Sequence, residues 1–366
     1  MQQLTSKQRV LMAVSHQNTD RVPVDYFVRR DVTHRLMKYL SLQTVEELYV
    51  RLGIDFRKIG LKETIPHFEQ RANGILGGSS EKSGEKYIMH PDGTYEDGWG
   101  IVHRQGRDGL YDQWIRGPFA QTTDLDSFDW PDMNIFESVE DLKEKVDAYE
   151  NKYALLGRLN LPFKVAWFMR GFENYLCDMM IDPGFARELS QRNAAYEKEK
   201  GMRFIQAGVD ILGIYGDISM QDRMLVNPEA WREIEKPIMA DMISGFKAQN
   251  PDIIIFYHSD GDLSEVMPDL IEIGVSMINP IQPECMDVAK VKRDYGDKIT
   301  LHGTVSIQKT LPNGTVEDVR NEIKDRITYC GENGGLVICP ANHVQNDTPL
   351  ENLLEVYRAS GAYTEG

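Results

Sequence analysis

Short apolar runs and longer stretches with helical spacing alternate along the chain. Runs such as DIIIFYH (252–258) and VDILGIYGD (209–217) are apolar at most positions, which is typical of parallel strands buried on both faces. Stretches between the runs, such as ESVEDLKEKVDAYENK, have the spacing of an amphipathic helix. The pattern predicts eight strands, over 22–28, 54–61, 153–157, 209–217, 252–258, 275–282, 298–303 and 336–340.

Eight strands that alternate with helices predict a (β/α)8 TIM barrel, formed by a single domain over residues 1–366. A long stretch after the second strand, at about 63–135, breaks the alternation. It contains turn dipeptides such as Asp92-Gly93, so we expect a hairpin-rich, β-rich insertion there. In such a barrel the chemistry is expected at the carboxyl ends of the strands.

Composition and charge exclude several classes of function. The chain has 366 residues and a net charge of −16, which argues against nucleic acid and anionic membranes as partners. No stretch approaches the roughly 20 apolar residues that cross a bilayer, and the N-terminal helix lacks the apolar centre of a signal peptide. Four cysteines without CxxC spacing do not form a disulfide framework. We expect a cytoplasmic protein, and leave a homodimer open.

Polar side chains follow the predicted strands where those strands end. Parallel strands end at the same edge of a sheet, so these side chains are expected to share one site. The candidates are Asp217 and Gln221, His258 and Asp260, Gln282 and Cys285, and Asn342 and His343.

Several motifs, taken in series, resemble the uroporphyrinogen decarboxylase superfamily. They are LTSKQRVLMAVSHQNTDRVPVDYF, FMRGFENYLCDMMIDP, GDISMQ, HSDGD, NPIQPECMD, LHGTVSIQKTLPNGTVEDVRNEI and GGLVICPANHVQNDTPLENL. The resemblance runs from about residue 4 to 360 and is poor over 63–135. It implies a (β/α)8 barrel and one of two activities: decarboxylation of a porphyrinogen without a metal, or methyl transfer between a small substrate and a corrinoid protein, often with zinc.

The chain departs from both patterns. Lys62 stands where the resemblance places the decarboxylase Asp. The methyltransferase His-x-Cys corresponds to His258-x-Asp260, and the later Cys to Asn342 or His343. The sequences of the motifs GDISMQ, HSDGD and NPIQPECMD are more similar to those of the methyltransferases, in particular to the substrate-demethylating components of O-demethylase systems.

The resemblance and the residue chemistry together give each candidate a role. Zinc accepts nitrogen, sulfur and carboxylate ligands, so a zinc site is predicted from His258, Asp260, Cys285 and His343. Catalytic roles are predicted for His343, Asp217 and His258, and substrate contacts for Arg170, Gln221, Asn342 and Gln282. Each residue also has a plainer interpretation: buried packing for Cys285, helix capping for Asp217, an ion pair for Arg170, and a structural hydrogen bond for His258.

The favoured hypothesis is a corrinoid-dependent methyltransferase. It would move a methyl group from a small donor, such as an aryl methyl ether, to the cobalt of a separate corrinoid protein, because the chain lacks the DxHxxG motif of corrinoid-binding segments. The alternatives are a uroporphyrinogen decarboxylase and a non-catalytic barrel that binds a tetrapyrrole.

Overall fold

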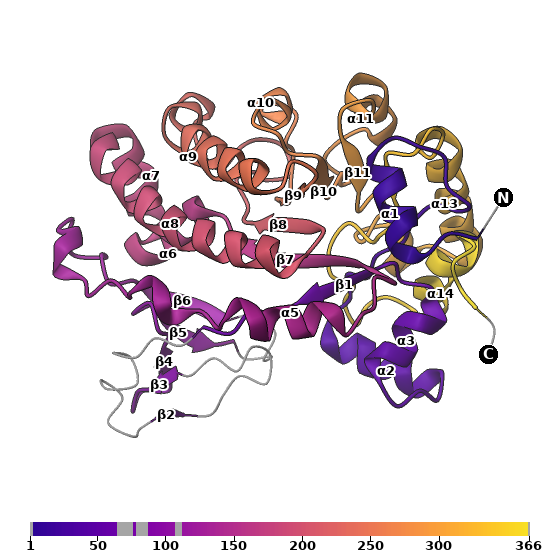
Figure 1. Cartoon of the computed structure of the whole chain (residues 1–366), viewed down its shortest axis with the longest axis horizontal. Helices are drawn as coiled ribbons and strands as arrows, with labels where there is room; N and C mark the ends of the chain where they lie inside the picture. Colours follow the sequence, from indigo (N-terminus) through magenta and orange to yellow (C-terminus); the bar gives the residue numbers. More distant parts are fainter. Residues whose placement is uncertain (1–2, 64–75, 78–86, 107–111, 365–366) are drawn as a thin grey trace.

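The computed structural model describes residues 3–63, 76–77, 87–106 and 112–364. Its centre is a curled parallel sheet of seven strands in the order β1-β7-β8-β9-β10-β11-β12 (Figure 1). Chain order and sheet order coincide from β1 to β12, as expected when crossover connections join neighbouring parallel strands. The strands are β1 (Phe56–Ile59), β7 (Ala154–Asn160), β8 (Ile211–Tyr215), β9 (Ile254–His258), β10 (Met277–Asn279), β11 (Thr300–His302) and β12 (Leu336–Val337).

The predicted first strand, 22–28, lies between the two edges of this sheet. Val24 and Val28 form isolated parallel bridges to Ile338 and Val344, beyond β12. On the other side the Asp55 N–H, just before β1, donates to the Val24 carbonyl at 3.0 Å. The segment thus contributes bridges instead of a regular strand, and an eight-stranded closed barrel remains a prediction.

Helices follow the strands and cover the sheet (Figure 1). Their apolar side chains pack into the core. Three of them, α1, α3 and α13, begin with capping boxes, in which a threonine and a side chain three residues later satisfy the first free N–H groups. The helices are α1 (Ser6–Val14), α2 (Arg30–Tyr39), α3 (Val45–Leu52), α5 (Val139–Asp147), α6 (Pro162–Arg170), α7 (Phe172–Ile181), α8 (Pro183–Ala207), α9 (Pro228–Gln249), α10 (Met267–Glu272), α11 (Val288–Tyr295), α12 (Thr310–Asn313), α13 (Val316–Cys330) and α14 (Leu350–Ala359).

A second, antiparallel sheet follows β1 in the chain. Its strands are β2 (Leu76–Gly77), β3 (Tyr87–Met89), β4 (Thr94–Glu96), β5 (Val102–Gln105) and β6 (Asp112–Arg116), in that order. The Asp92–Gly93 turn joins β3 to β4, and Gly93 has the positive φ of 81° that the turn needs. Two short 3₁₀ turns, Leu125–Ser127 and Met133–Ile135, lead to α5. Residues 64–75, 78–86 and 107–111 lie outside the described residues, so the full extent of the predicted insertion is untested.

Within the described residues, no helix combines the length and the apolar character needed to cross a membrane.

Candidate functional site

Three strand ends meet where the sequence places its polar side chains. In the sheet register, Tyr215 at the end of β8 pairs with His258 at the end of β9, and His258 pairs with Asn279 at the end of β10. Side chains paired in register lie on the same face, so an imidazole and an amide become neighbours. The His258 Nδ1 lies 2.5 Å from the Asn279 Oδ1.

Two carboxylates lie on the other side of the His258 ring. Its Nε2 is 4.0 Å from the Asp217 Oδ1 and 4.0 Å from the Asp260 Oδ1. One potential ligand atom from each of the three residues lies within 4.8 Å of the others. The structure brings together Asp217, predicted as catalytic, with His258 and Asp260, two of the four predicted zinc ligands.

The loops after β8 and β9 hold the two carboxylates together. The Asp260 N–H donates to the Asp217 Oδ1 at 2.9 Å, and the buried Ser259 hydroxyl accepts the Ile218 N–H at 3.0 Å. Gly261 follows with a φ of 93°, and a Cβ there would collide with the Met220 carbonyl. A glycine is needed because the two loops touch backbone to backbone.

Burial shifts both titratable groups towards their neutral forms. It lowers the pKa of His258 to about 4, against the opposing negative charge of Asp217. Burial, followed by the charge of Asp217, raises the pKa of Asp260 to about 7. The Asp260 Oδ1 is buried and has no hydrogen-bond partner among the described residues. An unpaired buried carboxylate oxygen is costly, which marks this atom as a place for a cation or a proton.

This donor set fits zinc. Zinc takes imidazole nitrogen and carboxylate oxygen at about 2.0–2.2 Å, which puts two tetrahedral ligand atoms roughly 3.4 Å apart. The observed separations of 4.0 Å are close to that value, and both carboxylates sit on loops. Three protein ligands would leave a fourth position for substrate, the arrangement of catalytic zinc sites.

Asn342 and His343, after β12, also reach this site. The Asn342 Nδ2 donates to the Asp260 Oδ2 at 2.5 Å, and the Asn342 Oδ1 accepts the His343 N–H at 2.6 Å. The His343 ring packs against Phe27, 5.3 Å between centroids, and Phe27 also contacts His258. Desolvation of the ring by its neighbours, with the positive charge of Lys58, lowers the pKa of His343 to about 4, although the residue as a whole is exposed. The predicted strand-end residues thus converge, although His343 lies outside the group of ligand atoms.

Cys285 is near the site but does not join that group. Its thiol lies close enough to Asp260 to feel its charge. Burial, with the charge of Glu284, raises the pKa of Cys285 to about 11, which favours the neutral thiol over the thiolate that binds zinc. Gln282 is buried beside it, while Gln221 is exposed and donates to the Gln308 Oε1 at 3.2 Å.

Arg170 has its guanidinium committed elsewhere. Its Nε donates to the Asp178 carboxylate at 2.6 Å and its Nη1 to the Phe119 carbonyl at 2.7 Å. These contacts tie the end of α6 to α7 and to the loop at Phe119. The structure therefore favours the ion-pair interpretation of Arg170.

Sequence reasoning missed three cations around the site. Lys58 on β1 lies over the Phe27 ring at 4.4 Å, and Arg158 on β7 lies over the Tyr215 ring at 4.6 Å. Lys164, at the start of α6, is close enough to Asp217 and Asp260 to feel their charges. None of the three forms an ion pair with another described residue. For Lys58 and Arg158, a charged residue within a strand was the available signal, whereas Lys164 lies on a helix and had no such signal.

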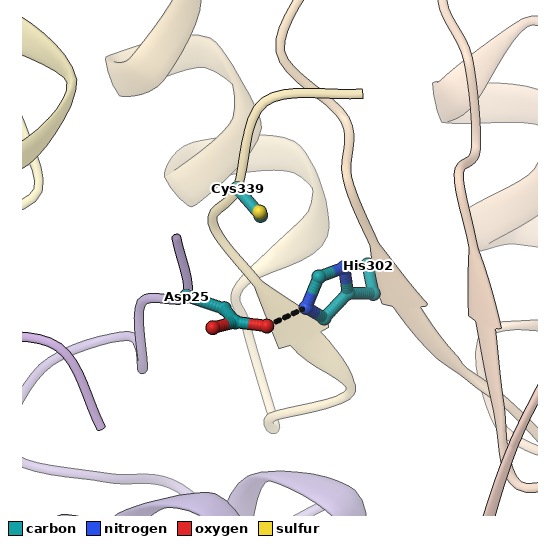
Figure 2. Close-up of side chains that lie close together, drawn as sticks. All are labelled: Asp25, His302 and Cys339. Carbon is teal, nitrogen blue, oxygen red and sulfur yellow. Dashed lines mark hydrogen bonds and ion pairs between the residues drawn. The ribbon is translucent and has the colours of Figure 1, made fainter. Parts of the chain in front are cut away.

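A second cluster lies deeper in the sheet (Figure 2). The buried side chains of Asp25, His302 and Cys339 point towards one another, and their potential ligand atoms lie within 4.8 Å. The His302 Nε2 lies 3.2 Å from the Asp25 Oδ2. None of the three is among the predicted site residues.

A family profile shows which protein family the chain belongs to. The uroporphyrinogen decarboxylase (URO-D) family profile matches residues 115–363, more than half of the chain. The chain belongs to the uroporphyrinogen decarboxylase family. This match confirms the resemblance seen in the motifs. It includes the strands from β7 to β12, whose ends form the candidate site.

Individual relatives of this URO-D chain are methyltransferases. A methylated-thiol–coenzyme M methyltransferase from Methanosarcina mazei is 23% identical over 258 residues, covering 65% of this chain and 62% of that protein. A methylcobamide:CoM methyltransferase, MtaA, from Methanosarcina barkeri is 24% identical over 159 residues, covering 43% of each. The chain thus spans less than two thirds of the length of either curated relative. A solved methyltransferase from Methanosarcina mazei shares the fold, with a TM-score of 0.67 at 16% identity over 98% of this chain and 99% of that one.

Proposed function

We propose that the protein is a corrinoid-dependent methyltransferase. It would transfer a methyl group from a small methylated donor to the cobalt of a separate corrinoid protein. The observation that carries the proposal is the Asp217–His258–Asp260 group, with one buried, unpaired carboxylate oxygen. The relatives named for methyl transfer and for methylcobamide support it.

The three residues of this group would hold a zinc ion. Zinc bound there would act as a Lewis acid on the oxygen or sulfur that carries the methyl group. Asn342 keeps the Asp260 carboxylate oriented by donating to its second oxygen. His343, neutral and beside Phe27, is placed to contact the substrate, while Gln221 and Gln282 remain candidate substrate contacts. Coordination by Cys285 or His343 would need movement from the positions described here.

The donor we propose is an aryl methyl ether with an anionic group. Lys58, Arg158 and Lys164 surround the site without carboxylate partners among the described residues, on a protein whose net charge is −16. Unpaired cations beside an otherwise acidic centre favour a substrate that brings its own negative charge. These three cations take the role of anion contact that the sequence suggested for Arg170, because the Arg170 guanidinium is already paired with Asp178.

A methyl-transfer assay with the zinc-loaded protein tests the function. The assay would offer 3-methoxybenzoate and other small methylated donors, with cob(I)alamin as acceptor. His258→Ala should lower the rate at least about a hundredfold if roughly 3 kcal/mol of barrier lowering is lost. The exposed His34→Ala is the matched control and should retain full activity.

A decarboxylase assay with uroporphyrinogen runs alongside. Lys62 is exposed on the chain after β1, where the resemblance requires a carboxylate. We therefore expect no coproporphyrinogen. Decarboxylation without methyl transfer from any donor would overturn the proposal.

A further inference from the structure

His258 is the end of a chain of hydrogen bonds that starts deep in the sheet. The Asp25 Oδ2 lies 3.2 Å from the His302 Nε2, and the His302 Nδ1 lies 2.7 Å from the Asn279 Nδ2. The Asn279 Oδ1 lies 2.5 Å from the His258 Nδ1. Four side chains from four different parts of the chain are thus connected in one line.

The direction of each hydrogen bond follows from the fixed donors and acceptors. The Asp25 carboxylate can only accept, so the His302 Nε2 carries a proton. In the neutral ring the His302 Nδ1 then accepts, which matches the Asn279 Nδ2 facing it. The other atom of the amide, Oδ1, must accept in turn, so the His258 Nδ1 carries a proton.

We propose that Asp25, His302 and Asn279 are positioning residues that fix the tautomer of His258, with its proton on Nδ1 and the Nε2 lone pair facing Asp217 and Asp260. A free Nε2 lone pair is what a metal ligand or a base requires. The tautomer itself does not depend on the proposed function; only its use for metal binding does.

The chain of hydrogen bonds from Asp25 through His302 and Asn279 to His258, called the relay below, lies in rigid surroundings. Asn279 and His302 are fully buried, and Asp25 nearly so. The His302 ring is enclosed by Phe27, Phe56 and Phe256, with centroids 5.2–6.0 Å away. The rings leave little room for His302 to turn and exchange its nitrogens.

Gly303 and the ionised state of Asp25 point to the same arrangement. A Cβ at Gly303 would collide with the Asn279 Nδ2, so the glycine leaves room for the amide. The second Asp25 oxygen accepts the Tyr26 N–H at 2.7 Å. Although burial opposes ionisation, the hydrogen bond with His302 and the charge of Lys58 keep the pKa of Asp25 below its usual value.

The relay also explains why Asp25, His302 and Cys339 are together without being a second metal centre. The His302 Nε2 bonds to Asp25 (Figure 2) and the Nδ1 to Asn279, so neither nitrogen has a free lone pair. Burial raises the pKa of Cys339 well above its ordinary value, so its sulfur is a neutral thiol. Zinc binding there would need to break two buried hydrogen bonds of the relay.

Nitrogen NMR of the full-length protein tests the tautomer directly. Long-range ¹H–¹⁵N correlation spectra of ¹⁵N-histidine-labelled protein distinguish protonated from unprotonated ring nitrogens, and His258→Gln assigns the signals among the eight histidines. We expect a protonated Nδ1 on His258 and a protonated Nε2 on His302, with or without zinc. A His258 with its proton on Nε2, or a doubly protonated His302, would overturn the inference.

Asn279→Leu removes the link and provides the second readout. We expect His258 to populate both tautomers and zinc affinity to fall about 10–100-fold, as for other partners of metal-bound histidines. Asn193→Leu, at another buried asparagine that bonds only within α8, is the control and should change neither. If Asn279→Leu does not fold, the wild-type spectrum alone decides.

Failure of the function and failure of the inference are distinguishable. Protein that never binds zinc but shows the predicted tautomer keeps the relay and contradicts the zinc site. Protein that binds zinc with the opposite tautomer contradicts the relay alone.

Discussion

The two ring nitrogens of His258 have different neighbours, and the sequence predicts the neighbours of only one nitrogen. HSDGD predicts a histidine and a carboxylate at a strand end, and the structure places Asp217 and Asp260 beside Nε2. The partner on Nδ1 is Asn279, which becomes a neighbour only through the register of β9 and β10. Register is set by the packing of the whole sheet, so sequence spacing places Asn279 at a strand end but could not reveal its bond to His258.

Arg158 gives a prediction at the same scale. Arg158→Gln removes a cation that lies over Tyr215 beside His258, so KM for 3-methoxybenzoate should rise at least about tenfold, a loss of about 1.4 kcal/mol of binding. The value of kcat should change less, because in our proposal Arg158 contacts the anionic group of the substrate and not the metal-binding atoms. Steady-state kinetics with 3-methoxybenzamide, which has no charge, and the exposed Arg293→Gln are the controls. Equal losses for acid and amide would contradict an anion contact.

Helix boundaries show how local chemistry decides what apolar spacing leaves open. The stretch from 167 to 208 has helical spacing throughout, yet the structure divides it into α6, α7 and α8. Gly171 has a φ of 97°, which ends α6, and Pro183 begins α8 because a proline tolerates the first helical turn. Most strands lie where they were predicted but are shorter, because the ends of several runs form loops. The exceptions are β7, which extends beyond the predicted 153–157, and the 22–28 segment, which forms only bridges.

Glu235 links three of these helices and gives a prediction for the pH dependence of stability. On α9 it accepts hydrogen bonds from Tyr175 on α7, at 2.7 Å, and Ser190 on α8, at 2.8 Å. Burial raises the pKa of Glu235 from its ordinary value of 4.5 to about 7. A raised folded-state pKa contributes stability that is complete below about 4.5 and is lost as the pH rises through about 7.

Glu235→Gln should therefore stabilise the fold at high pH and not at low pH. The neutral amide removes up to about 3 kcal/mol of penalty above pH 7, at about 1.4 kcal/mol per pKa unit. We expect the difference in unfolding free energy, mutant minus wild type, to increase from pH 5 to pH 8. Denaturant titrations at the two pH values measure it, and a difference that is constant or falls with pH would show that Glu235 stays ionised.

The whole molecule depends on joining its N-terminal segment to the sheet. Asp55, fully buried before β1, accepts from Arg9 of α1 at 2.6 Å, from Arg21 at 2.8 Å and from the Val24 N–H at 2.9 Å. These contacts hold the 22–28 segment against β1. The alternation of strands and helices predicted the general architecture, whereas this long-range network depends on residues far apart in sequence.

Asp55→Asn should destabilise the fold more than the loss of a surface pair. Removing one partner of a buried ion pair costs about 3–5 kcal/mol. Here Arg21 would lose its carboxylate, and Arg9 would keep only Asp20. Asp126→Asn, at an exposed carboxylate that pairs with Arg192, is the control and should cost less than about 1 kcal/mol. Chemical denaturation compares the two, and similar losses would contradict a structural role for the Asp55 network.

X-ray absorption at the zinc edge tests the central claim most directly. If Asp217, His258 and Asp260 hold the ion, zinc-loaded protein should show only nitrogen and oxygen neighbours at about 2.0–2.2 Å, and Asp260→Ala should abolish stoichiometric binding. A sulfur neighbour at about 2.3 Å would place Cys285 or Cys339 on the metal and contradict the site. Failure to bind zinc at all would contradict it equally.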